Sequence, residues 1–274
     1  MKKLTQYAIV TFLLILAASS QAKIIVVNTV DNANFNSGVT NLVTAINALA
    51  DGDTIAFNIP GTGVHQIDTP AGGYPLITKN NVTIDGYTQP TAVPNSNPIH
   101  AANNAQIKIL LSSTNGNCLS MEGSIEAFAG VTYDNLGFGY TEMAILGFFR
   151  GTNALVRGLA IQSAPQGTDG TYTGDIKSIA FCPDSLEVSP SGLANCANWR
   201  VSGCWWGLDP VTGQLATTPD WQGNGPTVWI PAICIAAYRT RNNDGSASQF
   251  ASPATIGVAK NSGNPSADFD VIIT

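Results

Sequence analysis

Few side chains of this chain could do acid–base chemistry. Three carboxylic acids, Asp175, Asp184 and Glu187, follow one another in a polar stretch of the second half. An inverting glycosidase holds two carboxyl groups roughly 6.5 to 9.5 Å apart, one acting as acid and the other as base. Nothing in the sequence sets the spacing of these three groups, and carboxylates in turns are ordinarily solvated. They are catalytic candidates without a defined pairing.

Arg157 and Arg200 are candidates for binding or catalysis at an anionic sugar. Each precedes a glycine in a short apolar segment, Gly158 and Gly203 respectively. When the segments are matched on these glycines, the arginines lie two positions apart, so the alternation of a strand puts both on one face. A guanidinium can bind a carboxylate through two parallel hydrogen bonds. The competing interpretation is a pair of ordinary surface arginines.

The five tryptophans gather between residues 199 and 229. Flat aromatic faces stack on sugar rings, which makes four of them glycan-binding candidates: Trp205, Trp206, Trp221 and Trp229. The competing interpretation is core packing, because tryptophan is highly buried on average. Trp205 and Trp206 are adjacent and point to opposite faces of a strand, so we expect one of them to be exposed.

The chain has five cysteines. We expect at least one disulfide within the set Cys182, Cys196, Cys204 and Cys234, with Cys118 left unpaired. Cys182 and Cys204 are about 22 residues apart, and neighbouring strands lie within disulfide range. No CxxC pair or nearby histidine indicates zinc. No series of alternating aspartates indicates calcium, which stays an open alternative, and no other metal and no cofactor is expected.

Composition limits the partners. The formal net charge is −6, and only 11% of the residues are charged. Nucleic acids and anionic membranes require clustered lysine and arginine, so neither is an expected partner. A hydrophobic fraction of 44% argues against disorder. The polar surface must therefore consist largely of uncharged groups.

The N-terminus has the layout of a secretory signal peptide. Lys2 and Lys3 precede an apolar run of about 11 residues, 8–18, and Ser20 and Ala22 are small residues ahead of a cleavage point. A membrane-spanning helix needs roughly 20 apolar residues, although an uncleaved anchor is the alternative. We expect residues 1–22 to be removed and the mature chain to be exported. No second long apolar run follows, so no membrane insertion is expected after cleavage.

The remaining sequence indicates one helix and many short strands. A strand is predicted at 24–27, and an apolar stripe predicts a helix over 38–50 with Ser37 as N-cap and Gly52 near its end. Short β runs separated by polar turns follow at 54–57, 82–84, 107–111, 144–149, 154–161, 178–181, 199–206, 228–238, 255–258 and 271–273. The run at 178–181 falls midway between Gly158 and Gly203, which suggests a repeat of about 22 residues and therefore a solenoid.

Residues 52–60, 75–78 and 82–90 resemble the opening of bacterial secreted right-handed parallel β-helix repeat proteins of the pectin-lyase-like group. Residues 155–161 and 201–209 resemble the coil motif of that group. The resemblance implies an all-β, single-domain β-helix over 23–274, with an N-terminal cap at 23–52 and coils from 53 onward. The last strand has no visible cap, so we expect either a truncated chain or end-to-end self-association through the open edge.

The pectin-lyase-like group includes polysaccharide lyases and glycoside hydrolases. Its hydrolases place clustered aspartates beside Gly-His-Gly and Arg-Ile-Lys segments, and neither segment occurs here. We therefore expect a secreted or cell-surface protein that binds a polysaccharide, a cell-surface glycan or another surface partner without catalysis. The alternatives are a carbohydrate-active enzyme with an unrecognised site, either lyase or hydrolase, and a structural fragment of a longer surface protein.

Overall fold

The computed structural model describes residues 21–98, 101–129, 143–163, 176–182, 198–206, 208–213, 233–235, 254–256 and 272–273. Most regular structure in these residues is β-strand, with short helices between strands. No helix among them is long and apolar enough to cross a membrane. The predicted signal peptide falls almost wholly on residues 1–20, outside the described residues.

The described strands form three sheets, named A, B and C. Sheet A contains, in spatial order, β1 (Ile24–Val27), β2 (Thr54–Phe57), β4 (Thr83–Asp85), β8 (Leu155–Arg157), β11 (Trp199–Ser202) and β14 (Ala254–Ile256). Sheet B contains β15 (Ile272–Ile273), β12 (Trp205–Trp206), β9 (Leu159–Ser163), β5 (Ile109–Ser113) and β3 (His65–Asp68). Sheet C contains β13 (Ile233–Ile235), β10 (Ile176–Cys182), β7 (Met143–Phe149) and β6 (Leu119–Ser120). Within these sheets all neighbouring strands are parallel except β6 and β7.

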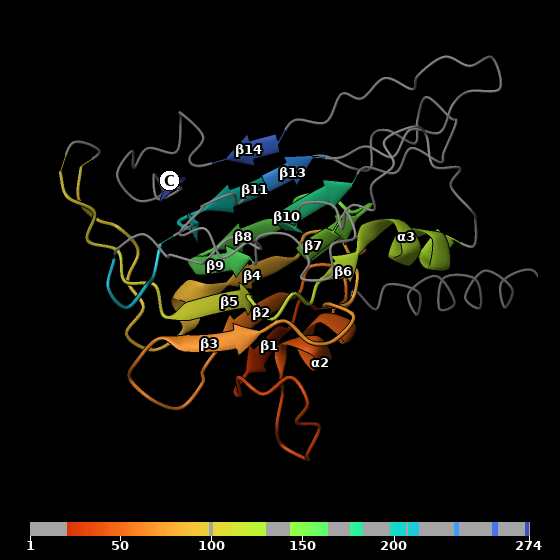
Figure 1. Ribbon diagram of the computed structural model, residues 1–274, viewed down its shortest axis with the longest axis horizontal. Helices are drawn as coiled ribbons and strands as arrows, with labels where there is room; N and C mark the ends of the chain where they lie inside the picture. Colours follow the sequence, from red (N-terminus) through yellow and green to blue (C-terminus); the bar gives the residue numbers. More distant parts are fainter. Residues whose placement is uncertain are drawn as a thin grey trace, which may run out of the picture.

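The later described strands visit the three sheets in rotation, whereas β1 to β7 fall in sheets A, A, B, A, B, C and C. From β8 onward the described strands fall in sheets A, B and C, again in A, B and C, and then in A and B. Each strand therefore lies beside the strand of the same sheet from the previous turn. Figure 1 shows the resulting stack of strands, with β1 and the helix α2 (Leu42–Asn47) at one end and β14 towards the other.

The register between turns corrects the predicted repeat. Leu155 pairs with Arg200 and Ala160 pairs with Trp205, so corresponding residues of these two turns are 45 apart. The strand that falls midway, β10, lies in sheet C and belongs to the same turn. The expected step of about 22 residues is therefore wrong here, because β8, β9 and β10 lie one in each sheet before the chain returns to sheet A at β11.

Side chains that point inward from the sheets form the core. Ile55, Ile84, Val156 and Val201 stand in register on successive strands of sheet A, and each is at most 1% exposed. Burying a side chain of this size stabilises a fold by about 1.5–3 kcal/mol. The match between turns therefore places one apolar side chain directly on the next.

An aromatic stack joins sheets C and A inside this core. The ring of Phe181 on β10 lies 4.9 Å from that of Phe148 on β7 and 5.1 Å from that of Trp199 on β11. All three side chains are at most 2% exposed. Separations of this size are favourable for stacked rings, so the stack adds to the stabilisation from burial alone.

The helix α2 is shorter than its apolar stripe predicts. It spans Leu42–Asn47 rather than 38–50. Its N-cap is Asn41 and not Ser37: the side chain of Asn41 accepts a hydrogen bond of 2.7 Å from the backbone N–H of Thr44. Gly38 has a φ of +82°, which a right-handed helix cannot include. The helix packs against β1, as expected for a cover of the first strand.

A second helix and two strands escaped the sequence analysis. The helix α3 spans Met121–Ala129, and Met121 and Ile125 are 1% and 0% exposed. Phe128 contacts Phe149 edge-on, with ring centroids 6.0 Å apart. Gly123 weakens the intrinsic helix propensity of this segment, so tertiary packing decides its conformation. The strands β3 and β6 are the two that were not predicted.

A column of left-handed residues precedes the strands of sheet A. Gly52, Asn81, Asn153 and Asn198 have φ values of +87°, +56°, +57° and +64°. Each lies two residues before the register formed by Thr54, Thr83, Leu155 and Arg200. Asparagine tolerates this conformation better than other side chains. The Nδ2 of Asn153 also donates to Oδ1 of Asn81 at 2.7 Å, which links two turns.

The predicted uncapped C-terminal coil falls largely outside the described residues. Beyond residue 235 the structure describes only β14 and β15. The first of these pairs with β11 and the second with β12.

Two glycines form the corners between sheets A and B. Gly158 and Gly203 have φ values of +69° and +58°, and they divide the predicted strands 154–161 and 199–206 into two strands each. A Cβ atom on Gly158 would lie 2.7 Å from the ring of Tyr87. Both corners therefore require glycine on two grounds, backbone conformation and space.

We predict that Gly158→Ala lowers the free energy of unfolding by about 3 kcal/mol, because it combines a strained φ with a clash against Tyr87. Gly213→Ala is the matched control: Gly213 has a φ of +67° but nothing within 4 Å of an added Cβ. We expect the control to cost about 1 kcal/mol. Urea unfolding followed by tryptophan fluorescence measures both, and equal costs would contradict the role of Tyr87.

Candidate functional site

The outer face of sheet A carries two of the predicted site residues. Val156 and Val201 face the core, so the adjacent Arg157 on β8 and Arg200 on β11 face outward. Arg200 pairs with Leu155, which places the arginines two positions apart on neighbouring strands. This agrees with the expectation from the sequence. Both side chains are partly exposed.

Arg157 binds a carboxylate of the protein itself. Its Nη2 donates to Oδ2 of Asp85 at 2.6 Å, and the Asp85 side chain is only 7% exposed while that of Arg157 is 41% exposed. Oδ1 of Asp85 accepts a second hydrogen bond, of 3.0 Å, from the backbone N–H of Tyr87. Charge-assisted bonds of this kind are stronger than neutral ones. A ligand carboxylate would therefore compete with Asp85 for Arg157.

Tyr87 fixes the position of this ion pair. It belongs to the 3-10 turn η1 (Gly86–Thr88), which follows β4, and its hydroxyl donates to the carbonyl of Gly203 at 3.0 Å. Its ring occupies the space that a side chain at Gly158 would need. One side chain thus ties β4 to the corners of the next two turns. Neither Asp85 nor Tyr87 was singled out from the sequence, because their partners lie 72 and 116 residues away.

A row of partly exposed side chains runs across the same face. Thr54, Thr83, Leu155 and Arg200 stand opposite one another on β2, β4, β8 and β11. Neighbouring strands are about 4.8 Å apart, so the row presents side chains at a regular interval. The threonine hydroxyls can donate and accept hydrogen bonds, and the guanidinium donates only. The row was not singled out from the sequence, since residues from four turns compose it.

The expected exposure of one tryptophan is wrong. Trp205 and Trp206 do face opposite sides of β12, because they pack into different apolar clusters. Both are nevertheless buried, with exposed fractions of 9% and 1%. Residues including Ala105 and Ile107 cover the outer side of sheet B over Trp205. Neither ring offers a free stacking platform for a sugar.

The predicted stack of Cys182 on Cys204 is also wrong. Cys182 ends β10 in sheet C, whereas Cys204 lies at the corner between sheets A and B, where its thiol is free and fully buried. Cys234 pairs with Ala180 rather than with Cys182. A diagonal offset of two residues separates such Cα atoms by about 8 Å, beyond disulfide range. Cys118 is a free, buried thiol.

The other predicted site residues fall outside the described part of the chain. These are Asp175, Asp184, Glu187, Cys196, Trp221 and Trp229. Among the residues that the structure does describe, no group of three or more His, Cys, Asp or Glu side chains could hold a metal ion.

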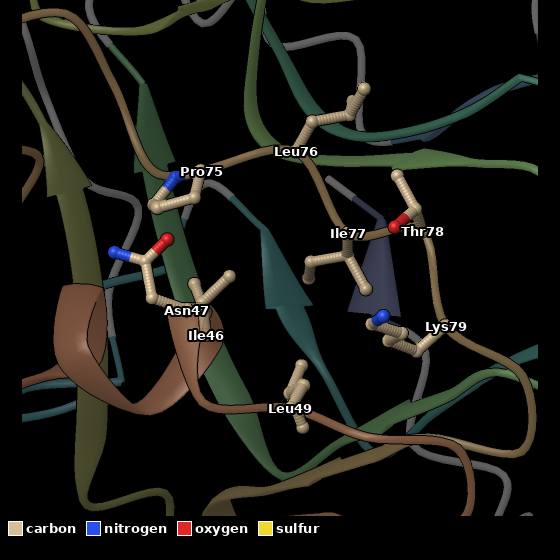
Figure 2. A pocket seen from close by; sticks show the side chains of 8 residues that line it. All are labelled: Ile46, Asn47, Leu49, Pro75, Leu76, Ile77, Thr78 and Lys79. Atoms are coloured by element: carbon tan, nitrogen blue, oxygen red, sulfur yellow. The ribbon is translucent and has the colours of Figure 1, made fainter. Parts of the chain in front are cut away.

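A shallow pocket lies between α2 and residues 75–79. Figure 2 shows Ile46, Leu49 and Ile77 along it, with Lys79 as its charged group. Its volume of about 130 Å³ is below the roughly 300–1,000 Å³ of ordinary small-molecule pockets. This is small for a sugar ring, so the outer face of sheet A is the better candidate for binding a polymer.

Comparison with protein-family models, with curated proteins and with solved structures found no match to this chain.

The ion pair gives a first prediction for this face. Asp85→Asn and Arg157→Ala should each lower the free energy of unfolding by about 1–2 kcal/mol, and the double variant should cost less than the sum. Asp85→Asn combined with Arg200→Ala is the matched control, because Arg200 does not pair with Asp85 in the register. Chemical denaturation measures six proteins: the wild type, the single variants Asp85→Asn, Arg157→Ala and Arg200→Ala, and the two double variants. Strict additivity for the Asp85–Arg157 pair would contradict a stabilising contact.

The buried thiols give a second prediction. Burial raises the pKa of Cys204 to about 12 and that of Cys118 to about 11, from an ordinary value of 9.0. The thiolate is the reactive form, so neither cysteine should react with an alkylating reagent at pH 8 in the folded protein. Both should react on unfolding without a reductant, which peptide mass spectrometry can show.

The raised pKa values of the two thiols also make the free energy of unfolding depend on pH. The unfolded chain releases the thiol protons near its ordinary pKa, while the folded protein retains them to higher pH. The contribution of these thiols to stability is therefore fully present below about pH 9 and is lost as the pH rises toward the raised values. In the labelling experiment on the unfolded protein, a Cys204 that reacts only after reduction would show a disulfide and contradict the prediction of a free thiol.

Proposed function

We propose that this chain is an exported right-handed parallel β-helix protein, similar to the pectin-lyase-like group, that binds an acidic glycan without cleaving it. Three largely parallel sheets, which the chain visits in rotation from β8 onward, support the β-helix. The positive-φ residues at matching places in successive turns support it further, since a repeated turn needs a repeated corner. The antiparallel pair β6 and β7 is a local departure from this pattern.

The row on the outer face of sheet A carries the binding proposal. Thr54, Thr83 and Arg200 are partly exposed, in register, and on the side of the sheet that faces away from the core. Hydroxyl groups at this interval can hydrogen-bond the hydroxyls of a chain of sugars. The guanidinium at one end suits a uronate carboxylate, which it can bind through two donors.

The ion pair supports binding rather than cleavage. A lyase removes a proton beside the uronate carboxylate and needs a group able to accept it. An arginine remains protonated in proteins, and the Nη2 of Arg157 already binds Asp85 at 2.6 Å. Asp85 in turn accepts hydrogen bonds from both Arg157 and the backbone N–H of Tyr87, so each of its carboxylate oxygens already has a partner within the protein.

The N-terminal sequence supports export. Two lysines, a short apolar run and small residues at Ser20 and Ala22 form the pattern that signal peptidases cleave. An extracellular location would bring the protein to polysaccharides, which are its proposed ligands.

The proposal predicts retention on polygalacturonate or another acidic polysaccharide in affinity electrophoresis, with no product formed. Arg200→Ala should weaken retention about tenfold, because it removes the charged donor of the row. Lys79→Ala is the matched control, since Lys79 is a cation that lines the pocket beside α2 and does not belong to the row, and its retention should equal that of the wild type.

Two outcomes would overturn the proposal. Failure to retain any acidic or neutral polysaccharide would remove the glycan as ligand. Unsaturated products that absorb in the ultraviolet, and that disappear in Arg200→Ala, would make the protein a lyase.

A further inference from the structure

A second buried carboxylate, Asp53, lies at the beginning of the first turn. It is 1% exposed and stands directly before β2. Its Oδ2 accepts a hydrogen bond of 2.9 Å from the backbone N–H of Ala50, and its Oδ1 accepts one of 2.8 Å from the backbone nitrogen of Lys23. Both donors are neutral peptide groups. A buried ionised carboxylate is ordinarily matched by a positive charge or by several strong donors.

The nitrogen of Lys23 is the atom that signal-peptide cleavage would release. Hydrolysis of the Ala22–Lys23 bond adds one water molecule. The oxygen of the water joins the carbonyl carbon of Ala22, which becomes a carboxylate. Its two protons are added to the nitrogen of Lys23, which becomes an ammonium group. The donor at 2.8 Å from Asp53 would then carry a full positive charge. An α-amino group is mostly protonated at neutral pH.

The surroundings of Lys23 would hold the new ammonium group in place. The carbonyl of Lys23 accepts a hydrogen bond of 2.8 Å from the backbone N–H of Thr54. The next four residues form the strand β1, which pairs with β2. Gln21 and Ala22 are exposed, so their removal uncovers no core side chain. One N–H of the ammonium group can continue to donate its hydrogen bond to Asp53, while the other two face water.

We infer that Asp53 is the built-in receptor for the α-ammonium group of the mature chain, so that export processing completes an ion pair that fastens β1 to the first turn. This inference rests on the export and cleavage proposed above. The precursor can make only the neutral hydrogen bond at the same place. The mature protein is therefore more stable than the precursor, because the nitrogen of Lys23 gains a positive charge beside Asp53.

The experiment compares two purified proteins, one that begins at Lys23 and one that retains Gln21 and Ala22 ahead of it. The extended protein should show an unfolding equilibrium constant about tenfold larger, because a charged hydrogen bond to a buried carboxylate becomes a neutral one. In an Asp53→Asn background, the two start points should differ by less than about twofold.

Asp31→Asn is the matched control. Asp31 is an exposed carboxylate in the same N-terminal region, and its Oδ1 accepts only a local hydrogen bond, of 2.9 Å, from the backbone N–H of Ala33. The tenfold difference between the two start points should persist in this background. If Asp53→Asn does not fold, acetylation of the α-amino group of the protein that begins at Lys23 replaces it and should abolish the gain.

The possible failures are distinguishable. Equal stability of the two start points, or an equal difference in the Asp53→Asn and wild-type backgrounds, would overturn the ion pair. The intact mass of the exported protein tests the processing separately. A mass that corresponds to a start other than Lys23 would overturn the cleavage site, and one that includes residues 1–22 would overturn cleavage itself.

Discussion

The register between successive strands of sheet A is the constraint on which the rest of this structure depends. A parallel strand can add to the pile only if its apolar residues land on those of the strand before it, since a slip of one residue would turn the core side chains outward. The column of left-handed residues ahead of the strands holds this register. Asn80 extends the same contact, because its Oδ1 accepts a 2.9 Å hydrogen bond from the backbone N–H of Thr152, one turn later.

Uncharged polar side chains supply many of the hydrogen bonds that hold the turns of this chain in place. Gln89 is 1% exposed, and its amide both accepts from the backbone N–H of Ile59 and donates to its carbonyl, each at 2.8 Å. It thus replaces the strand partner that Ile59 lacks at that point. Asn41 serves similarly by binding two backbone carbonyls and capping α2. A chain with few charges can satisfy its turns in this way because amides both donate and accept.

Among the residues that the structure describes, the buried carboxylates Asp53 and Asp85 are the exceptions, and each lies where turns meet. Asp85 joins β4 to β8 through Arg157, while Asp53 joins the beginning of β2 to the residue that precedes β1. A buried charge is costly unless it is fully bonded, so each of these contacts resists separation of the strands it links. The outer face of sheet A can present Arg200 and its neighbouring threonines at fixed intervals because these links hold the strands beneath it.

The sequence by itself determined most strand positions of sheet A, the apolar faces of those strands and the common face of Arg157 and Arg200, because each follows from alternation within a few residues. It did not determine that one turn carries three strands, that Trp205 is covered or that Cys204 lies apart from Cys182. Those facts depend on how far the chain travels before it returns to the same sheet, and insertions between strands change that distance from turn to turn. Only the tertiary structure brings Tyr87 to Gly203 and Asp85 to Arg157, since hydrogen bonds between residues so far apart leave no local pattern.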